Sequence, residues 1–364
     1  MNLARRAFNQ GTAAALMSSL CGAQARAGAQ SPHWRMPDEA DAHRRTWMSF
    51  GASARIWGER LLPTVRDNLG LIAATIAEFE PVSMLVRPKE MKLAREVCGP
   101  KVQLLACPVD DLWARDMGCV FVTTSAGNRA AVDFNFNGWG GKQAHAADKA
   151  VARFMATQLG IPRLQTPLVL EGGGIEVDGG GTAIITESCV LNANRNPGRS
   201  RASVEVELKR LLGLEHIIWL PGLRGHEITD GHTDFYARFA TPGVVVAHLD
   251  NDPDSPDHEV TRRHLAILRS ARDAAGRKLQ VVPIETSTRT RAMTQRDEAC
   301  TGYINFYVCN GGLLVPEFGD DRADEAARRT LAELFAGREV VPLNIDGIAA
   351  GGGGIHCATQ QEPG

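Results

Sequence analysis

With 364 residues, of which 44% are hydrophobic, the chain can bury a substantial core in one large domain or two. Its 40 Lys and Arg nearly balance its 42 Asp and Glu, and the formal net charge is −2. This balance excludes a strongly basic field for nucleic acid and a polybasic patch for a membrane surface. Small-molecule chemistry remains as the class of function, and the oligomeric state stays open, a homo-oligomer included.

Residues 1–27 differ in character from the rest of the chain. Two arginines at 5–6 precede a short, weakly apolar run at 12–20, and an A-x-A-like cleavage site follows. This order is typical of a twin-arginine export signal, and the run is too short to span a membrane. We therefore expect cleavage near Ala27, a mature domain over residues 28–364, and a periplasmic or secreted location. An ordinary amphipathic N-terminus is the alternative.

Alternating segments predict an α/β architecture for the mature chain. Short apolar runs predict strands at 47–50, 81–86, 102–107, 119–122, 182–186, 217–220, 279–284, 303–309, 313–315 and 340–344. Amphipathic spacing predicts helices at 61–79, 89–97, 148–159, 202–212, 260–275 and 322–335. The strand at 340–344 is expected to be the last one before the glycine-rich turn at 351–354.

The segment D-D-L-W-A-R-D-M-G at 110–118 is the first candidate for function. Trp113, Arg115 and Asp116 lie together there, just before a predicted strand. They suit a structural salt bridge under an aromatic ring, or half of a cation-binding pocket.

A four-residue string, G-G-G-I, occurs twice, at 172–175 and at 352–355. Glu171 precedes the first copy, and the second leads into His356 and Cys357. The match indicates a repeated supersecondary unit, or else chance; a repeat would bring both strings to a common centre. Glycines let a ligand or another chain approach closely, so we interpret Cys357 as a nucleophile on a crowded turn. A buried structural cysteine is the alternative.

Residues 229–239 are predicted to form a turn that feeds a strand. In a strand, residues two apart point to the same face, so His232 and Asp234 would project side by side. That arrangement is a paired base and carboxylate, with a buried structural pair as the alternative. No H-E-x-x-H spacing is present around His226, so a zinc-binding helix is not expected.

Seven cysteines follow the export segment: Cys98, Cys107, Cys119, Cys189, Cys300, Cys309 and Cys357. An odd number without C-x-x-C spacing predicts neither a zinc knuckle nor a complete disulfide framework, and at least one thiol stays free. Pairing of Cys98 with Cys107 is left open.

Five candidates can be combined into one site: Asp116, Glu171, His232, Asp234 and Cys357. A thiolate nucleophile needs a proton carrier, which His232 can supply. Carboxylates raise a thiol pKa and would hinder an ordinary cysteine protease, so the acids are expected to serve a cationic substrate. A guanidinium fits, because a carboxylate can accept two parallel hydrogen bonds from it.

Five motifs carry a family resemblance: W-A-R-D-M-G (113–118), L-E-G-G-G-I (170–175), N-R-N-P (194–197), D-G-H-T-D with A-R-F (230–234 and 237–239) and G-G-G-I-H-C-A-T-Q-Q (352–361). From about residue 33 to 363 the chain resembles the agmatine deiminase and bacterial peptidylarginine deiminase family, in the guanidino-group-modifying superfamily. This resemblance implies one α/β propeller (pentein) of five ββαβ-type units about a pseudo-fivefold axis, with the site in the central channel. It implies hydrolysis of a guanidino group to a ureido group with release of ammonia, with no metal and no organic cofactor. Agmatine, converted to N-carbamoylputrescine on the way to putrescine and other polyamines, is the first substrate it suggests.

The resemblance also implies a role for each candidate. Cys357 would attack the guanidinium carbon, and His232 would protonate the departing ammonia and later activate water to resolve a thiouronium intermediate. Asp116 and Asp234 would hold the guanidinium nitrogens, while Glu171 would orient His232 and help bind the cation.

Substrate contacts are also expected from Trp113 and Gly354. In agmatine-selective members an acid commonly stands four residues before the histidine; here Ile228 stands there, with Glu227 one step further away. Peptide-linked arginine is therefore the second candidate substrate. An amidinotransferase, a catalytically silent guanidine-binding protein and a general cysteine amidase are the rival functions.

Overall fold

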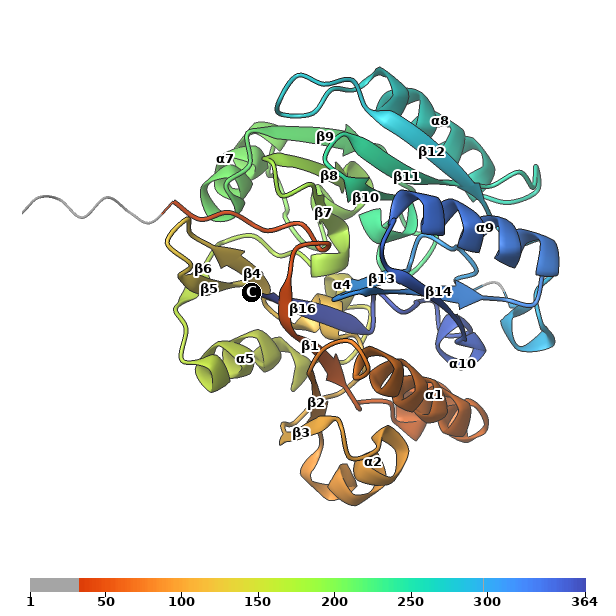
Figure 1. The fold of residues 1–364 in the computed structure, drawn as a ribbon. Helices are drawn as coiled ribbons and strands as arrows, with labels where there is room; N and C mark the ends of the chain where they lie inside the picture. The colour runs from red at the N-terminus through yellow and green to blue at the C-terminus, as the bar shows by residue number, and fades with distance from the viewer. Residues whose placement is uncertain (1–32, 297) are drawn as a thin grey trace, which may run out of the picture. The chain divides into compact units, whose positions relative to one another are not determined.

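The computed structural model describes residues 33–296 and 298–364, and Figure 1 shows them as a coloured ribbon. The predicted export segment, 1–27, and its boundary with the mature domain lie outside these residues. Within the described part, no helix combines the length and the apolar character that crossing a bilayer requires.

The described strands form five separate sheets, which confirms the predicted α/β class. Their orders are β16-β1-β2-β3, β4-β5-β6, β7-β8-β9, β10-β11-β12 and β13-β14-β15. The strands are β1 (His43–Ser49), β2 (Val82–Val86), β3 (Gln103–Ala106), β4 (Val120–Thr123), β5 (Arg129–Asp133), β6 (Arg163–Gln165), β7 (Ile175–Val177), β8 (Thr182–Thr186), β9 (His216–Leu220), β10 (Ala237–Thr241), β11 (Val244–Leu249), β12 (Gln280–Glu285), β13 (Tyr307–Cys309), β14 (Gly312–Glu317), β15 (Glu339–Asn344) and β16 (Thr359–Pro363).

Helices connect these strands and cover the sheets. The α-helices are α1 (Ala54–Ile76), α2 (Met91–Cys98), α3 (Ala114–Met117), α4 (Gly138–Gly141), α5 (Val151–Leu159), α6 (Glu187–Val190), α7 (Arg201–Leu212), α8 (Asp257–Ser270), α9 (Asp321–Leu334) and α10 (Asp346–Ala349). The 3-10 turns are η1 (Pro88–Glu90), η2 (Asp148–Ala150), η3 (Gly172–Gly174), η4 (Thr233–Phe235) and η5 (Ala292–Thr294).

One connection pattern recurs in all five sheets. Two strands pair antiparallel, and a helix then leads to a third strand that pairs parallel to the second, as in β4-β5-α5-β6. The same order describes β7-β8-α7-β9, β10-β11-α8-β12 and β13-β14-α9-β15. In the first sheet, β16 supplies the antiparallel strand, so residues from both ends of the described chain share that sheet. The five sheets therefore share one ββαβ connection order.

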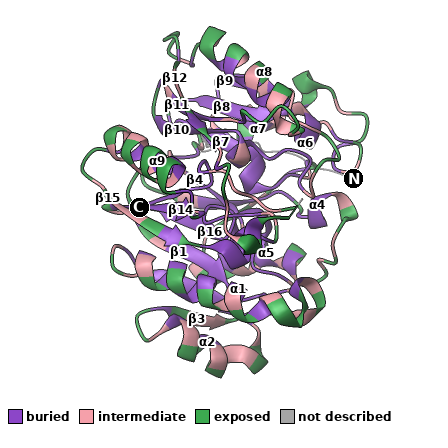
Figure 2. Ribbon diagram, turned by 90° about the vertical axis from the view of Figure 1, so that its right-hand side faces the viewer, coloured by how far each residue is buried: buried purple, intermediate pink, exposed green. Residues whose placement is uncertain are grey.

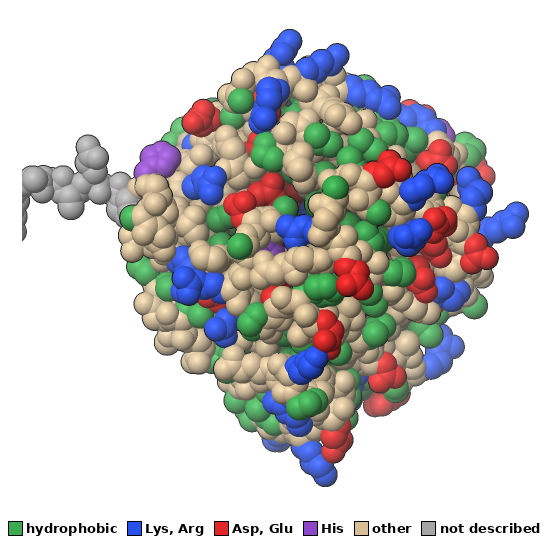
Figure 3. Space-filling view, in the orientation of Figure 1, with side chains coloured by type: hydrophobic (Ala, Val, Ile, Leu, Met, Phe, Trp, Pro, Cys, Tyr) green, Lys and Arg blue, Asp and Glu red, His purple; other side chains and the backbone are tan. Residues whose placement is uncertain are grey.

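Burial differs between the strands and the covering helices. In Figure 2 the strands are mostly buried, whereas the outer turns of α2 and α9 are exposed. On the face drawn in Figure 3, acidic and basic side chains are interspersed. This matches the near-balance of the two charge types in the sequence.

The strand predicted at 340–344 is confirmed as β15, the last strand before the glycine string, but the sequence did not predict strand β16 after that string. The residues of β16 are polar and lack the apolar alternation by which a strand is recognised. The strand is nevertheless buried, because its polar side chains have partners: Trp47 Nε1 donates to Glu362 Oε2 at 3.0 Å, and Arg115 Nη1 donates to Gln361 Oε1 at 2.6 Å. Buried hydrogen bonds here replace the hydrophobic pattern.

The prediction that an extended strand carries His232 and Asp234 is wrong. Asp230 and Gly231 have φ of 62° and 91°, and η4 follows, so strand β10 begins only at Ala237. Positive φ at two successive residues reverses the chain, and the backbone then closes a tight turn in place of a ladder.

Other boundaries also differ from prediction; helix α8, for example, ends at Ser270 and not at 275. Helix α1 begins seven residues before position 61, but Gly58, with φ 70° and ψ 157°, interrupts it. The strand predicted at 303–309 is confined to β13, because Asn305 O accepts from His356 N at 3.2 Å and so bonds to a turn instead of a strand.

Candidate active site

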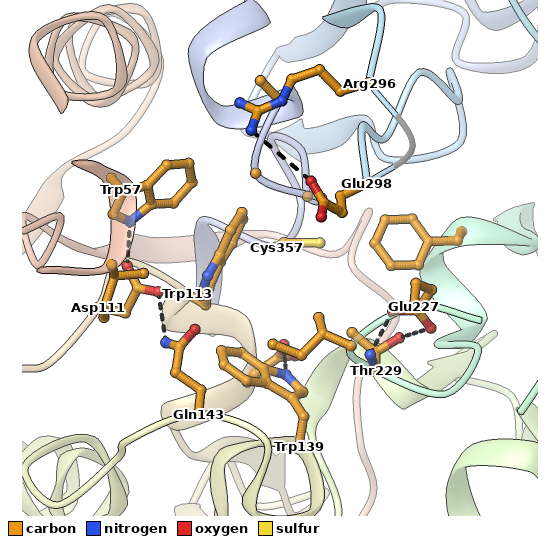
Figure 4. A pocket seen from close by; sticks show the side chains of 18 of the residues that line it. Trp57, Asp111, Trp113, Trp139, Gln143, Glu227, Thr229, Arg296, Glu298 and Cys357 are labelled. Atoms are coloured by element: carbon orange, nitrogen blue, oxygen red, sulfur yellow. Dashed lines mark hydrogen bonds and ion pairs between the residues drawn. The ribbon is translucent and has the colours of Figure 1, made fainter. Parts of the chain in front are cut away.

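A cavity of about 700 Å³ lies where several of these units end. Three tryptophans, Trp57, Trp113 and Trp139, line it, and Cys357 and Asp116 open onto it. Figure 4 shows the sulfur of Cys357 pointing into the space between the tryptophans and the segment that carries Glu227. A cavity of this size, with aromatic walls and several polar side chains between them, has the character of a small-molecule site.

Close packing around the last glycine string positions the thiol. A Cβ at Gly353 would lie 2.2 Å from the Trp113 ring, and one at Gly354 would lie 2.5 Å from Asn305 Oδ1. Only glycine allows the backbone to approach both side chains this closely. Gly354, predicted to contact substrate, is buried against Asn305 and is not among the residues that line the cavity, whereas Gly353 is.

Asn305 holds the nucleophile from two sides. Its Nδ2 donates to Cys357 Sγ at 3.2 Å, and its Oδ1 accepts from the Cys357 backbone N–H at 3.2 Å. The sulfur also lies 3.5 Å from Asp234 Oδ2. Burial and the nearby charges of Asp234 and Asp116 raise the pKa of Cys357 well above its ordinary value. In the absence of a cation the group is therefore a thiol rather than a thiolate.

His232 is fully buried and is fixed at one ring nitrogen. Its Nε2 lies 3.1 Å from Glu171 Oε2, and both oxygens of Glu171 accept from Arg195 Nε at 2.9 Å. Burial alone would lower the pKa of His232, but the charge of Asp116 and the bonds with Cys189 and Glu171 raise it well above its ordinary value. The imidazole is thus held in its protonated form.

The other nitrogen of His232 faces two carboxylates. Nδ1 is 3.8 Å from Asp116 Oδ1 and 4.0 Å from Asp234 Oδ1, and among the described residues it has no hydrogen-bond partner. Asp234 Oδ1 is likewise buried and unpartnered. Two unpaired polar atoms this close together, beside a thiol, are costly in a folded core and mark a binding site.

The two aspartates are oriented by different neighbours. Asp116 accepts from Trp139 Nε1 at 2.9 Å and from the Gly173 N–H at 3.1 Å. Asp234 accepts from His356 Nδ1 at 2.7 Å. Each carboxylate therefore keeps a fixed direction toward the space between Cys357 and His232.

A buried ionic cluster supports His356 from behind. Its Nε2 lies 2.9 Å from Glu39 Oε2, and Glu39 also pairs with Arg115 at 2.9 Å and with Arg238 at 2.7 Å. For segment 110–118 the two predicted roles are a structural salt bridge and half of a cation-binding pocket. Arg115 forms a salt bridge with Glu39, and Asp116 faces the cavity. These adjacent residues point in different directions because they lie on the helical turn α3, where successive side chains are about 100° apart.

The structure thus brings the five predicted residues to one place, together with both G-G-G-I strings. Gly173 of the first string lies against His232 and Asp116, since a Cβ there would meet their atoms at 2.7 and 2.9 Å. Sequence reasoning gave no role to five residues that contact the site: Asn305, Arg195, Cys189, His356 and Glu39. Arg195 is within a quoted motif and His356 adjoins the cysteine, but nothing in the sequence singled out Asn305 or Glu39.

Glu171, Cys189 and His232 also place one potential metal ligand each within 4.8 Å of one another. Arg195, however, occupies both oxygens of Glu171 with a full positive charge. A divalent cation here would face that guanidinium, so the donor set fits a metal poorly and fits the orientation of His232 well. All seven described cysteines are free, including Cys98 and Cys107.

Asp116 sets an expected acid limit for activity. Burial raises the pKa of Asp116 to about 6, although the charge of His232 and the Trp139 hydrogen bond lower it. The pKa of Asp234 and that of Glu171 are instead lowered: burial opposes their ionisation, but their hydrogen bonds outweigh it. Below pH ~6 Asp116 is protonated and cannot pair with a cation, so kcat/KM for a guanidinium substrate should fall about tenfold per pH unit.

The pH dependence of kcat/KM in wild type and in Asp116→Asn tests this assignment. The variant cannot ionise, so its lower kcat/KM should lack the acid limb near pH ~6. A wild-type profile that stays flat to about pH 5 would contradict it.

Known proteins resemble this chain over nearly its whole described length. Residues 35–363 match the profile of the Porphyromonas-type peptidyl-arginine deiminase family. A Streptomyces coelicolor protein is 43% identical over 337 residues, which cover 91% of this chain and 99% of that protein. The agmatine deiminase of Stutzerimonas stutzeri is 36% identical over 354 residues, covering 90% and 95%. The solved structure of Enterococcus faecalis agmatine deiminase has a TM-score of 0.85 and 29% identity, covering 91% and 96%.

Proposed function

Because this chain belongs to the Porphyromonas-type peptidyl-arginine deiminase family, we propose that it hydrolyses agmatine to N-carbamoylputrescine and ammonia. The family resemblance inferred from the five motifs is confirmed by the match over residues 35–363. One observation of the site carries the proposal: a buried thiol, a protonated imidazole and two carboxylates face a common space, with two of their polar atoms unpartnered. A planar cation with several N–H donors complements this set.

Substrate binding activates the nucleophile in this proposal. A guanidinium between Asp116 and Asp234 neutralises the charges that hold the pKa of Cys357 high. The thiol then loses its proton more readily, and Asp234 Oδ2, 3.5 Å from the sulfur, is placed to accept it. Asn305 Nδ2 remains as a donor that stabilises the developing thiolate.

Acid–base chemistry at His232 completes the reaction. Sulfur adds to the guanidinium carbon, and the C–N bond then breaks as His232 delivers its proton to the leaving nitrogen, which departs as ammonia. A thiouronium on Cys357 remains. The neutral imidazole takes a proton from water, whose oxygen attacks the same carbon. Cleavage of the C–S bond then frees the sulfur, which recovers its proton from Asp234. The ureido product forms as the hydroxyl proton of the adduct passes to solvent.

Incubation of the purified protein with agmatine tests the function directly. Ammonia and a ureido product should appear in equal amounts, which excludes transfer of the amidino group to another amine. Free arginine and a peptide with an internal arginine serve as comparison substrates, and both should have lower kcat/KM than agmatine. Turnover of the peptide alone would overturn the agmatine assignment, and binding of agmatine without product would support a silent guanidine-binding protein.

We also infer that the five ββαβ units close into a propeller around this site. Support comes from the repeated strand order and from the pairing of β16 with β1, which links the last unit to the first. An experimental structure in which the ring of units is open would contradict the inference.

The proposal for residues 1–27 is export through the twin-arginine route to the periplasm or beyond. Its support is the order of paired arginines, short apolar run and cleavage site in the sequence. Replacement of Arg5 and Arg6 by lysine should shift the full-length chain from the periplasmic to the cytoplasmic fraction. An unchanged distribution would contradict twin-arginine export.

A further inference from the structure

A second cavity, of about 370 Å³, adjoins the active-site cavity. The two share the residues His226, Glu227, Phe235, Glu298 and Gly352 along a common wall. Agmatine, a guanidine on a four-carbon amine, is small beside the 700 Å³ of the first cavity alone. A longer tail on the same guanidino group can therefore reach past the shared residues into the second cavity.

Acidic side chains dominate this second cavity, which we call the distal chamber. Asp250 and Asp257 line it in addition to Glu227 and Glu298, and none of the described residues that line it is Lys or Arg. Asp257 Oδ1 accepts from Tyr236 Oη at 3.0 Å, a neutral donor that leaves the carboxylate charge uncompensated. Glu298 instead pairs with Arg296 at 4.0 Å, whereas Asp257 has no cationic partner among the described residues. A surface of one sign concentrates ions of the opposite sign.

His248 provides an independent sign that the chamber binds a ligand. Its side chain lines the chamber, only 8% of the residue is exposed, and its Nδ1 is buried with no hydrogen-bond partner in the part of the chain that the structure describes. Burial lowers the pKa of His248, even though Asp257 and Asp250 oppose that shift, so the ring is neutral. A neutral imidazole nitrogen can accept a hydrogen bond from an ammonium group.

We propose that the distal chamber is a subsite for a second ammonium group, so that the substrate class extends from agmatine to linear guanidines whose tails carry two amines. Asp257 supplies the charge, and His248 supplies an uncharged acceptor. The proposal rests on the proposed function, because it places the guanidino group of the same molecule at Cys357.

Three guanidines of defined length test the subsite: agmatine, agmatine extended by a 3-aminopropyl group, and an extended analogue that ends in a methyl group. Wild type should process the amine-ended compound with kcat/KM about tenfold above that of the methyl-ended compound. Asp257→Asn should reduce that advantage about fivefold and change kcat/KM for agmatine less than twofold. Asparagine can still accept from Tyr236, which limits damage to the fold.

Asp254→Asn is the matched control, since Asp254 is an exposed acid three residues away that does not line the chamber. This variant should leave kcat/KM for all three guanidines unchanged. Equal kcat/KM for the two extended compounds in wild type would overturn the subsite. So would an equal change of kcat/KM in Asp257→Asn and Asp254→Asn. Neither result would contradict the activity on agmatine. If no guanidine releases ammonia, the proposed function fails. Calorimetry then tests the subsite separately: the amine-ended compound should bind wild type more tightly than it binds Asp257→Asn, and equal affinities would overturn the subsite.

Discussion

Replacement of Cys357 by serine should lower kcat for agmatine by about 10⁴-fold or more, because a hydroxyl cannot form the proposed sulfur–carbon intermediate. Agmatine binding should change little, since Asp116, Asp234 and the aromatic walls of the cavity remain in place. Single-turnover kinetics measures the first effect, and calorimetry on the same variant measures the second. Loss of chemistry with retained binding separates a nucleophile from a residue that merely lines the site.

Cys98→Ala is the matched control for a buried thiol. Cys98 ends helix α2, outside the residues that line the cavity, and burial raises its pKa to about 12. This variant should keep wild-type kcat even if it loses some stability. More than a hundredth of the wild-type kcat in Cys357→Ser would rule out covalent catalysis at Cys357. A complete loss of agmatine binding would instead show that the thiol position is needed to form the site.

The sequence predicted the site residues better than it predicted their backbone. His232 and Asp234 do lie together, with 4.0 Å between ring nitrogen and carboxylate oxygen, but a 3-10 turn brings them there instead of a strand. A two-residue spacing and a motif predict proximity, and neither distinguishes the two backbone conformations. Positive φ at Asp230, a non-glycine residue, decides the outcome, and it depends on tertiary contacts such as the ion pair with Arg195.

Residues that act through other residues were the hardest to predict. Asn305 reaches Cys357 across 52 positions of sequence, and Glu39 reaches His356 across more than 300. Neither lies in a periodic pattern or a spaced motif, because their partners are fixed by how separate units pack. Strand β16 was missed for the same reason: its polar residues are buried only because Trp47, Arg115 and Arg129 lie opposite them.

Arg238→Met should reduce the free energy of unfolding by about 3–5 kcal/mol, the largest stability effect we expect from one substitution. The Arg238 guanidinium is 1% exposed, pairs with Glu176 at 2.8 Å and with Glu39 at 2.7 Å, and lies over the Phe306 ring at 4.7 Å. Methionine retains much of the volume but removes the cation that Glu39 and Glu176 share. Burial raises the pKa of Glu176 to about 8, so Glu39 carries the buried negative charge at neutral pH. A shift of the urea unfolding midpoint measures the loss.

Arg277→Met is the matched control. Arg277 also pairs with a carboxylate, Asp273, at 2.6 Å, but its side chain is 53% exposed, so its loss should cost less than about 1 kcal/mol. A cost below that value for Arg238→Met would show that the cluster does not depend on its central cation.

The pH dependence of the loss in unfolding free energy in Arg238→Met identifies the carboxylate whose charge is responsible. Burial opposes ionisation of Glu39, but Arg238, His356 and Arg115 together hold its pKa well below the ordinary value. A depressed pKa stabilises the fold above the unfolded pKa of about 4.3, and this contribution disappears as the pH falls through the folded value. Removal of Arg238 should therefore lower the free energy of unfolding most near neutral pH and progressively less under acidic conditions. Because Glu39 bonds to His356, and His356 bonds to Asp234, the variant should also lose kcat/KM for agmatine. A deficit independent of pH would assign the loss to packing against Phe306 rather than to charge.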